Sequence, residues 1–329
     1  MELQGKKILV TGAGGFIGSH LSEALVESGA KVKALVHYNS RNDWGLIELL
    51  PGEIKESLEV VTGDIRDPFF MRDIVQGCQI VFHLAALIAI PYSYTAATSY
   101  VDTNVKGTLN VLQACLDAGV ERVVHTSTSE VYGTAQYTPI DEKHPLQGQS
   151  PYSASKIGAD MLAESFKRSF GLPVSIIRPF NCYGPRQSAR AIIPTIITQA
   201  LVSPKLKLGA LTPIRDLTYV KDTVDGFIAV AESDRTVGEV INFGTGSGLS
   251  IGRLAKKIMG LVGKDREIIC DERRMRPEES EVMELICDAG KARELVGWEP
   301  RYTLENGLQE TIAWIKQHLS WYKTEVYNV

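Results

Sequence analysis

The chain has 329 residues, which suits a large α/β domain with an attached lobe better than one small domain. Hydrophobic residues make up 44% of it and charged residues 22%, the balance of an ordinary globular protein. The net charge of −4 provides no electrostatic basis for binding nucleic acid or an anionic membrane, so we predict neither partner.

The cysteines are scattered, at positions 78, 115, 182, 270 and 287. Their spacing matches neither a zinc site nor a disulfide framework, so we expect no metal centre and a reducing compartment. The first ten residues run directly into a strand-like pattern without a signal-peptide core, and no apolar run is long enough to cross a bilayer. These features favour a cytoplasmic protein.

Short runs of Val, Ile and Leu alternate with amphipathic stretches of helical length through the first 180 residues. Continuous apolar runs are typical of parallel strands that are buried on both faces, so the pattern predicts an α/β fold with a doubly wound parallel sheet. The predicted strands are 7–11, 31–36, 58–62, 80–84, 122–126 and 174–177, and the predicted helices are 16–28, 69–76, 98–118 and 152–170.

The rhythm changes after Pro179, where Gly, Pro and Arg interrupt residues 181–193. A short helix, two small strands around Pro213, a buried strand and two further helices follow, the last three at 240–243, 251–262 and 304–318. We therefore predict a dinucleotide-binding Rossmann domain at 1–180, to which 218–246 return, and a smaller mixed α/β substrate lobe from 181–217 and 247–329.

A glycine-rich loop follows the first strand and opens the first helix, with Gly12, Gly15 and Gly18 spaced three residues apart around Phe16 and Ile17. Small residues let a pyrophosphate approach the backbone at the helix N-terminus. Alone, such a triplet also fits a tight turn, but its place between strand and helix favours a bound NAD or NADP.

Two further segments are candidates for cofactor contacts. The second strand is followed by His37, Ser40 and Arg41 rather than by the acid typical of NAD-selective sites, which favours NADP unless Arg41 is simply solvated. After the third strand, Asp64 and Ile65 are placed to hold the adenine, although a turn or cap role for Asp64 is an equal alternative.

Tyr152 and Lys156 lie one helical turn apart and so share a face. A neighbouring ammonium and an oxidised nicotinamide are expected to lower the tyrosine pKa from its usual value of about 10, which would let Tyr152 act as a base. Thr128 follows the fifth strand and is placed to share a substrate hydroxyl, and Glu130 is placed to remove a proton from the next carbon. The alternatives are an ordinary amphipathic helix for the pair and a solvated loop charge for Glu130.

Taken together, these residues resemble the extended short-chain dehydrogenase/reductases, specifically the nucleotide-sugar 4,6-dehydratases. The likeness covers nearly the whole chain, and its narrower part, residues 87–94, resembles bacterial dehydratases of N-acetylhexosamine nucleotides in legionaminic-type sugar pathways. Where dTDP-glucose dehydratases carry Asp-Glu after the catalytic threonine, this chain has Ser129-Glu130, as in the GDP-mannose enzymes. The motifs are the glycine loop, residues 83–86 and 104–108, the Thr128/Glu130/Tyr152/Lys156 set, and residues 178–181, 183–186, 215–216 and 276–277.

The resemblance implies a cycle in which C4 of an NDP-N-acetylhexosamine, UDP- or GDP-linked, is oxidised and water is eliminated across C5 and C6. The hydride then returns to C6 and a proton to C5. Glu130 would return its proton to the leaving hydroxyl, or Ser129 would relay one. The alternatives are hydride return to C4, which leaves a 5,6-alkene, a C4 epimerase, and a scaffold protein that senses NAD(P) without turnover.

The resemblance also implies site residues and an assembly. Leu84, Ala85 and Ala86 would line the cofactor. Asn181, Arg190, Arg215 and Arg276 would bind the nucleotide sugar, with Arg186 a weaker candidate, and Asn104 and Lys106 would be structural. Helices 98–118 and 152–170 would pair across a two-fold axis into a four-helix homodimer interface.

Overall fold

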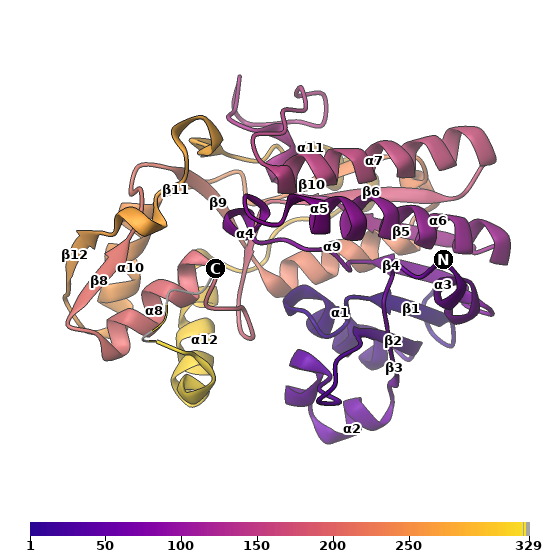
Figure 1. Cartoon of the computed structure of the whole chain (residues 1–329), viewed down its shortest axis with the longest axis horizontal. Coiled ribbons are helices and arrows are strands. Elements are labelled where there is room, and N and C mark those ends of the chain that lie inside the picture. Colours follow the sequence, from indigo (N-terminus) through magenta and orange to yellow (C-terminus); the bar gives the residue numbers. More distant parts are fainter. Residues whose placement is uncertain (325, 327–329) are drawn as a thin grey trace.

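The computed structural model describes residues 1–324 and 326 (Figure 1). Its main feature is a parallel sheet of seven strands in the order β10-β6-β5-β4-β1-β2-β3. The order reverses between β1 and β4, which creates the switch point where ligands of doubly wound folds bind. The strands are β1 Lys7–Thr11, β2 Lys31–His37, β3 Glu59–Gly63, β4 Ile80–His83, β5 Arg122–Thr126, β6 Val174–Pro179 and β10 Val240–Phe243.

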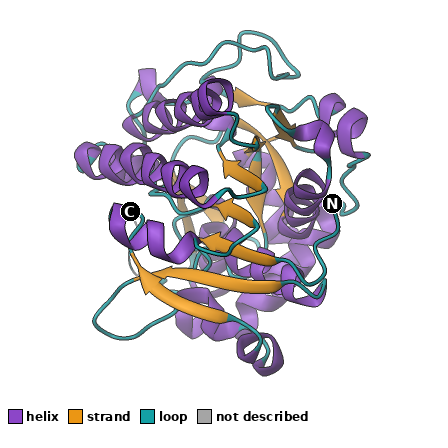
Figure 2. Ribbon diagram, turned by 90° about the vertical axis from the view of Figure 1, so that its right-hand side faces the viewer, coloured by secondary structure: helices purple, strands orange, loops and turns teal. Residues whose placement is uncertain are grey.

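Helices cover both faces of this sheet (Figure 2). Ile8 and Val10 of β1 point into one apolar cluster, with α1 and α9, whereas Leu9 points into another, with α3, α6 and α7. Both sets are completely buried, which explains why the strands read as unbroken apolar runs. These helices are α1 Phe16–Glu27, α9 Val220–Glu232, α3 Pro68–Val75, α6 Gly107–Ala118 and α7 Pro151–Phe170.

The second lobe lies beyond the carboxyl end of the sheet, on the left of Figure 1. Its apolar core is continuous with that of the large domain through α8, α9 and α12, so the two parts share one interior. The lobe's strands are β7 Asn181–Tyr183, β9 Ile214–Tyr219, β11 Gly248–Ser250 and β13 Glu284–Leu285, with a separate pair of β8 Lys205–Leu208 and β12 Glu267–Cys270. Its helices are α8 Ile192–Val202, α10 Ile251–Val262 and α12 Leu304–Gln317, and α11 Gly290–Val296 lies beside β10.

The predicted helix at 98–118 is not one regular helix. It consists of α5 Ala97–Tyr100, a π-helical segment Val101–Lys106 and α6. The wider turn carries Asn104, whose side chain bonds to both backbone groups of Leu87 and to Ser155 of α7, at 2.8–2.9 Å. Asn104 thereby joins the loop after β4 to the helix of Tyr152, in line with the structural role expected for it.

The sequence prediction missed the short helices α2 Gly52–Glu56 and α4 Ile90–Ser93, and it also missed α9 and α11. Within the part of the chain that the structure describes, no helix combines the length and apolar character needed to cross a membrane.

Candidate active site

The predicted site residues come from the carboxyl ends of the parallel strands. The glycine loop follows β1, Ala85 follows β4, Thr128 follows β5 and Asn181 follows β6. Because these ends meet at one edge of the sheet, residues separated by more than 150 positions lie at the same edge, on the side of the lobe.

The glycine loop is shaped for a close ligand. Gly12 has φ +73°, and a Cβ there would lie 2.8 Å from the backbone nitrogen of Ala85. A Cβ on Gly18 would lie 2.2 Å from the carbonyl oxygen of Gly12, so the loop can approach the helix only without side chains. Gly15 caps α1 without any side-chain hydrogen bond, which leaves the first amides around Phe16 and Ile17 for an anionic ligand.

A hydrogen-bonded chain that the sequence analysis missed holds the facing loop. The Thr11 hydroxyl accepts from the amides of Leu84 and Ala85 at 3.1 and 3.2 Å and contacts Nδ1 of His83 at 2.8 Å. Nε2 of His83 contacts the Thr108 hydroxyl at 3.0 Å. These contacts fix the segment containing Leu84, Ala85 and Ala86 opposite the glycine loop.

The segment after β2 presents its candidates to solvent. The side chains of His37 and Arg41 are 75% and 82% exposed, and Ser40 is exposed as well. Arg41 lies 3.5 Å from Asp43, an acid beyond the strand end that the sequence analysis did not consider. The following Leu46 donates to the Gly14 carbonyl at 2.9 Å, so this loop packs against the glycine loop.

Asp64 is engaged by Arg66 in this structure. The carboxylate accepts from the backbone and side chain of Arg66 at 2.5–3.0 Å, and this hydrogen bonding lowers the Asp64 pKa. His37 lies 3.7 Å away. The geometry is that of the turn role for Asp64, while the neighbouring Ile65 is buried against Gly107.

Tyr152 and Lys156 lie in the first two turns of α7, which a capping box between Ser150 and Ser153 holds at its start. Both side chains are buried. The Lys156 ammonium donates to the Thr126 carbonyl at the end of β5, at 2.6 Å. Burial lowers the pKa of Lys156 to about 8, and the charge of Asp160 opposes this effect.

The protein's own groups act on the Tyr152 pKa in opposite directions. Burial raises it above its usual value, a hydrogen bond with Thr128 works against that rise, and the charge of Glu130 adds to it. Together these groups leave the Tyr152 pKa above its usual value, because burial penalises the charged phenolate.

Thr128, Ser129 and Glu130 form the start of a short 3₁₀ turn, Ser129–Tyr132. The Thr128 hydroxyl accepts from the Glu130 amide at 3.2 Å, which fixes the turn directly after β5. Ser129 is buried, and only 8% of Glu130 is exposed. Burial shifts the pKa values of Tyr152 and of Arg215 on β9, and the Glu130 charge adds to the rise at Tyr152 and opposes the fall at Arg215. Glu130 is therefore not a solvated loop charge.

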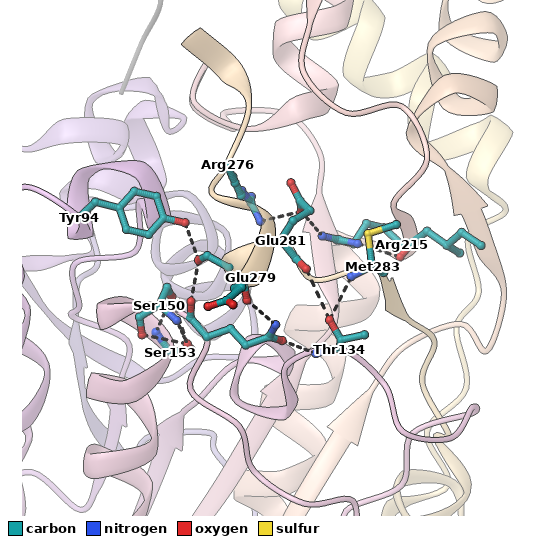
Figure 3. A network of polar contacts seen from close by, with 12 residues as sticks. Tyr94, Thr134, Ser150, Ser153, Arg215, Arg276, Glu279, Glu281 and Met283 are labelled. Carbon is teal, nitrogen blue, oxygen red and sulfur yellow. Dashed lines mark hydrogen bonds and ion pairs between the residues drawn. The ribbon is translucent and has the colours of Figure 1, made fainter. Parts of the chain in front are cut away.

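Arg215 and Arg276 converge on one carboxylate, that of Glu281 (Figure 3). Each guanidinium lies 3.3 Å from the same Oε1 of Glu281. Arg215 is almost completely buried, and burial lowers its pKa while Glu130 and Glu281 oppose the change. The two predicted arginines thus form a paired cationic site that a carboxylate of the protein occupies.

The segment 278–283 around Glu281 is attached to the Rossmann domain (Figure 3). Tyr94 and Ser280 share a hydrogen bond of 2.7 Å, and Ser280 donates to the Gln149 carbonyl at 2.6 Å. Gln149 also donates to the Glu279 carbonyl at 2.9 Å. The segment therefore lies between the two arginines and the start of α7.

The other predicted substrate residues differ in their surroundings. Oδ1 of Asn181 is buried and, among the described residues, has no hydrogen-bond partner. Arg190 is exposed, and its charge opposes the rise that burial causes in the pKa of Tyr100. The Tyr100 ring packs edge-on against the ring of Tyr152. Arg186 instead forms an ion pair with Glu23 and a hydrogen bond with His20, both on α1. It therefore links the segment after β7 to α1 and is not part of the arginine pair.

Known proteins resemble this chain over almost its whole length. The family model described as GDP-mannose 4,6 dehydratase matches residues 9–311. The dTDP-D-glucose 4,6-dehydratase of Mus musculus is 31% identical over 331 residues, which cover 97% of this chain and 92% of that protein.

Two solved structures are similar over almost their full length. The dTDP-glucose 4,6-dehydratase of Streptomyces venezuelae, solved with NAD bound, has a TM-score of 0.85 and 31% identity and covers 96% of this chain and 99% of its own. The UDP-N-acetylglucosamine 4-epimerase of Methanobrevibacter ruminantium M1, in complex with UDP-N-acetylmuramic acid, has a TM-score of 0.87 and 30% identity with the same coverage. The chain therefore belongs to the GDP-mannose 4,6 dehydratase family, within the extended short-chain dehydrogenase/reductase nucleotide-sugar dehydratases and epimerases.

Proposed function

We propose that the protein is a nucleotide-sugar 4,6-dehydratase that acts on an NDP-N-acetylhexosamine, UDP- or GDP-linked. The observation that carries the choice of a dehydratase is the buried Glu130, held beside Tyr152 by the Thr128 turn. Oxidation and epimerisation at C4 give such a carboxylate no task, whereas elimination of water needs a base for the C5 proton. The N-acetylhexosamine rests on the resemblance of residues 87–94, and the cytoplasmic location rests on the cysteine usage.

NAD or NADP is the proposed cofactor. The glycine loop fits its pyrophosphate because Gly12 and Gly18 let the loop pack tightly against Ala85 and against its own backbone, and Gly15 leaves the first amides of α1 without a side-chain cap. When bound, the nicotinamide supplies the oxidising and reducing equivalents and a positive ring charge. His37, Ser40 and Arg41 would lie near the adenosine ribose. Asp43 supplies a carboxylate in the same loop.

The chain's own residues would divide the proton transfers. Tyr152 takes the proton of the C4 hydroxyl, which Thr128 helps to orient, and Lys156 stabilises the phenolate. The ketone that forms at C4 makes the C5 proton acidic, and Glu130 removes it. Water leaves from C6 with a proton that Glu130 returns or Ser129 relays. A nearby positive charge would favour the Tyr152 phenolate, whose formation burial opposes.

Arg215, Arg276 and Asn181 are proposed to bind the substrate diphosphate and sugar, with Arg190 at the edge. Guanidinium pairs match phosphate oxygens, and Asn181 has a buried oxygen without a partner. In this arrangement Glu281 competes with the diphosphate for both arginines.

Glu281→Gln is therefore expected to bind a nucleoside diphosphate several-fold more tightly, while Arg215→Met binds it at least about tenfold more weakly. Calorimetric titration with UDP and GDP measures both, and Glu278→Gln, a change in the same segment, provides the control. Equal affinities for Glu281→Gln and the wild type would contradict a competing carboxylate.

The proposed reaction is tested by mass spectrometry of products from a panel of UDP- and GDP-N-acetylhexosamines, with NAD or NADP, in deuterated water. A 4,6-dehydratase releases one water and incorporates deuterium at C5. Conserved mass with an inverted C4 would identify an epimerase, and a 5,6-alkene would identify hydride return to C4. Binding of both ligands without any turnover would support a sensing scaffold.

We also propose a homodimer through α6 and α7. These adjacent helices leave large apolar side chains exposed, namely Val101 before α6, Leu109 on α6, and Met161 and Phe170 on α7. A second copy of the same face would cover them as a four-helix bundle. Light scattering decides this, since a monomeric mass would exclude it.

A further inference from the structure

A buried charged cluster lies behind the Tyr152–Lys156 pair and is not used in the mechanism above. Its centre is Asp160, one helical turn after Lys156 on α7 and 0% exposed. Oδ2 of Asp160 accepts from the Ser127 hydroxyl at 2.7 Å and from Nη2 and Nε of Arg178 at 2.9 and 3.2 Å. Oδ1 lies 3.3 Å from Nε2 of His125.

The contacts of Asp160 and Lys156 end on two consecutive residues, the last of β5 and the one directly after it. Lys156 donates to the Thr126 carbonyl, and Ser127, the next residue, donates to Asp160. Ser127 in turn directly precedes Thr128. Two successive turns of α7 therefore hold the end of β5, and the position of Thr128 relative to Tyr152 depends on both contacts.

The charges of the cluster are unequal. Lys156 and Arg178 are cations, and Asp160 is the acid between them. His125 of β5 and His83 of β4 face the same space, but burial lowers their pKa values, so they add no positive charge. Burial alone would raise the Asp160 pKa, but His125, Arg178 and Lys156 together lower it. One positive charge is left over, which is the complement of a Tyr152 phenolate.

Behind the cluster, the Tyr132 hydroxyl accepts from Nη1 of Arg178 at 3.0 Å, and the charge of Glu142 acts on Tyr132. Two further charged groups lie on the substrate side. Glu130 faces Tyr152 from the turn after β5, and Arg215 of β9 faces Glu130. Asp160 is consequently the acid that faces Lys156 from behind, whereas Glu130 acts on the tyrosine.

We propose that Asp160 is a positioning residue that keeps Lys156 charged and aligned with Tyr152 and fixes the strand end that carries Thr128. Its catalytic consequence rests on the proposed function of the Tyr152–Lys156 pair. The electrostatic part concerns the protein alone and can be measured without substrate.

The test is an NMR titration of the full-length protein labelled with ¹³C at lysine Cε, in which the Lys156 signal is assigned by its loss in Lys156→Gln. In Asp160→Asn the Lys156 titration is expected to move down from about pH 8 by roughly one unit or more. Ser127→Ala removes a hydrogen bond to the same carboxylate but keeps its charge, so the titration should stay in place. Arg178→Gln removes a cation and should move it upward, which keeps the test valid if Asp160→Asn does not fold.

Turnover provides the second readout. The alkaline limb of kcat against pH is expected to move down with the Lys156 titration in Asp160→Asn and to be restored in Asp160→Glu. A lower kcat without such a shift indicates a merely structural role and overturns the proposal, as does an unchanged Lys156 titration in folded Asp160→Asn. If the titration shifts as expected but the wild type converts no nucleotide sugar, the proposed function fails and the coupling of Asp160 to Lys156 stands.

Discussion

Glu130→Gln is expected to abolish formation of the 4-keto-6-deoxy product, with a loss of about 100- to 10,000-fold in kcat. The amide keeps the shape of the side chain but cannot accept the C5 proton. Since Glu130 is held by the Thr128 turn and is not one of the proposed phosphate ligands, nucleoside diphosphate binding should persist. Product mass measures the loss of dehydration, and deuterium incorporation at C5 measures the loss of proton removal from that carbon.

The matched control is Glu121→Gln, at the opposite end of β5, where the carboxylate pairs with Lys6 on the surface. This variant should retain wild-type turnover, because exposed ion pairs contribute little to stability and this one lies far from the carboxyl edge of the sheet. Undiminished dehydration by Glu130→Gln would remove the carboxylate from the mechanism. An epimerase would instead continue to invert C4 in this variant, which makes Glu130 the residue that separates the two activities.

The parallel sheet was predictable from sequence because its strands are buried on both faces. Leu9 and Val10 enter different apolar clusters, yet both are fully buried, so the strand shows an unbroken apolar run with sharp ends. β1, β5, β10 and α10 match their predicted bounds, and the other predicted strands and helices differ by only one or two residues at an end, apart from the interrupted helix at 98–118. That interruption depends on Asn104 reaching Leu87 and Ser155, which no local pattern reveals.

The site was predictable only where neighbours in sequence are neighbours in space. Tyr152 and Lys156 share a helix, and Thr128 and Glu130 share a turn, so spacing alone relates the members of each pair. Glu281 lies between Arg215 and Arg276 because the 278–283 segment binds Gln149, more than 100 residues earlier. Spacing likewise relates Tyr152 to the nearby ammonium but does not show the depth of burial, which raises the Tyr152 pKa in the protein alone.

Tyr152→Phe is expected to lower kcat by about 100- to 10,000-fold while the protein stays folded and binds its ligands. The ring remains, so its edge-on packing against Tyr100, with centroids 6.2 Å apart, is retained, and only the hydroxyl that contacts Thr128 is lost. Both the oxidation at C4 and the later elimination should stop, because the C5 proton becomes acidic only after the ketone forms. Deuterium at C5 should therefore be absent.

Tyr137→Phe provides the control for this substitution. Its hydroxyl donates to Asp141 on the surface at 2.7 Å, and turnover should be unchanged. Thermal unfolding of both variants reports whether the fold survives, and calorimetric titration with the nucleotide and the cofactor reports whether binding does. A Tyr152→Phe protein that binds both and still dehydrates the sugar would exclude the phenol as the base. Loss of C5 exchange in Tyr152→Phe and in Glu130→Gln, with binding intact in both, would place the two residues in consecutive steps of one reaction, since the ketone must exist before the carboxylate can act.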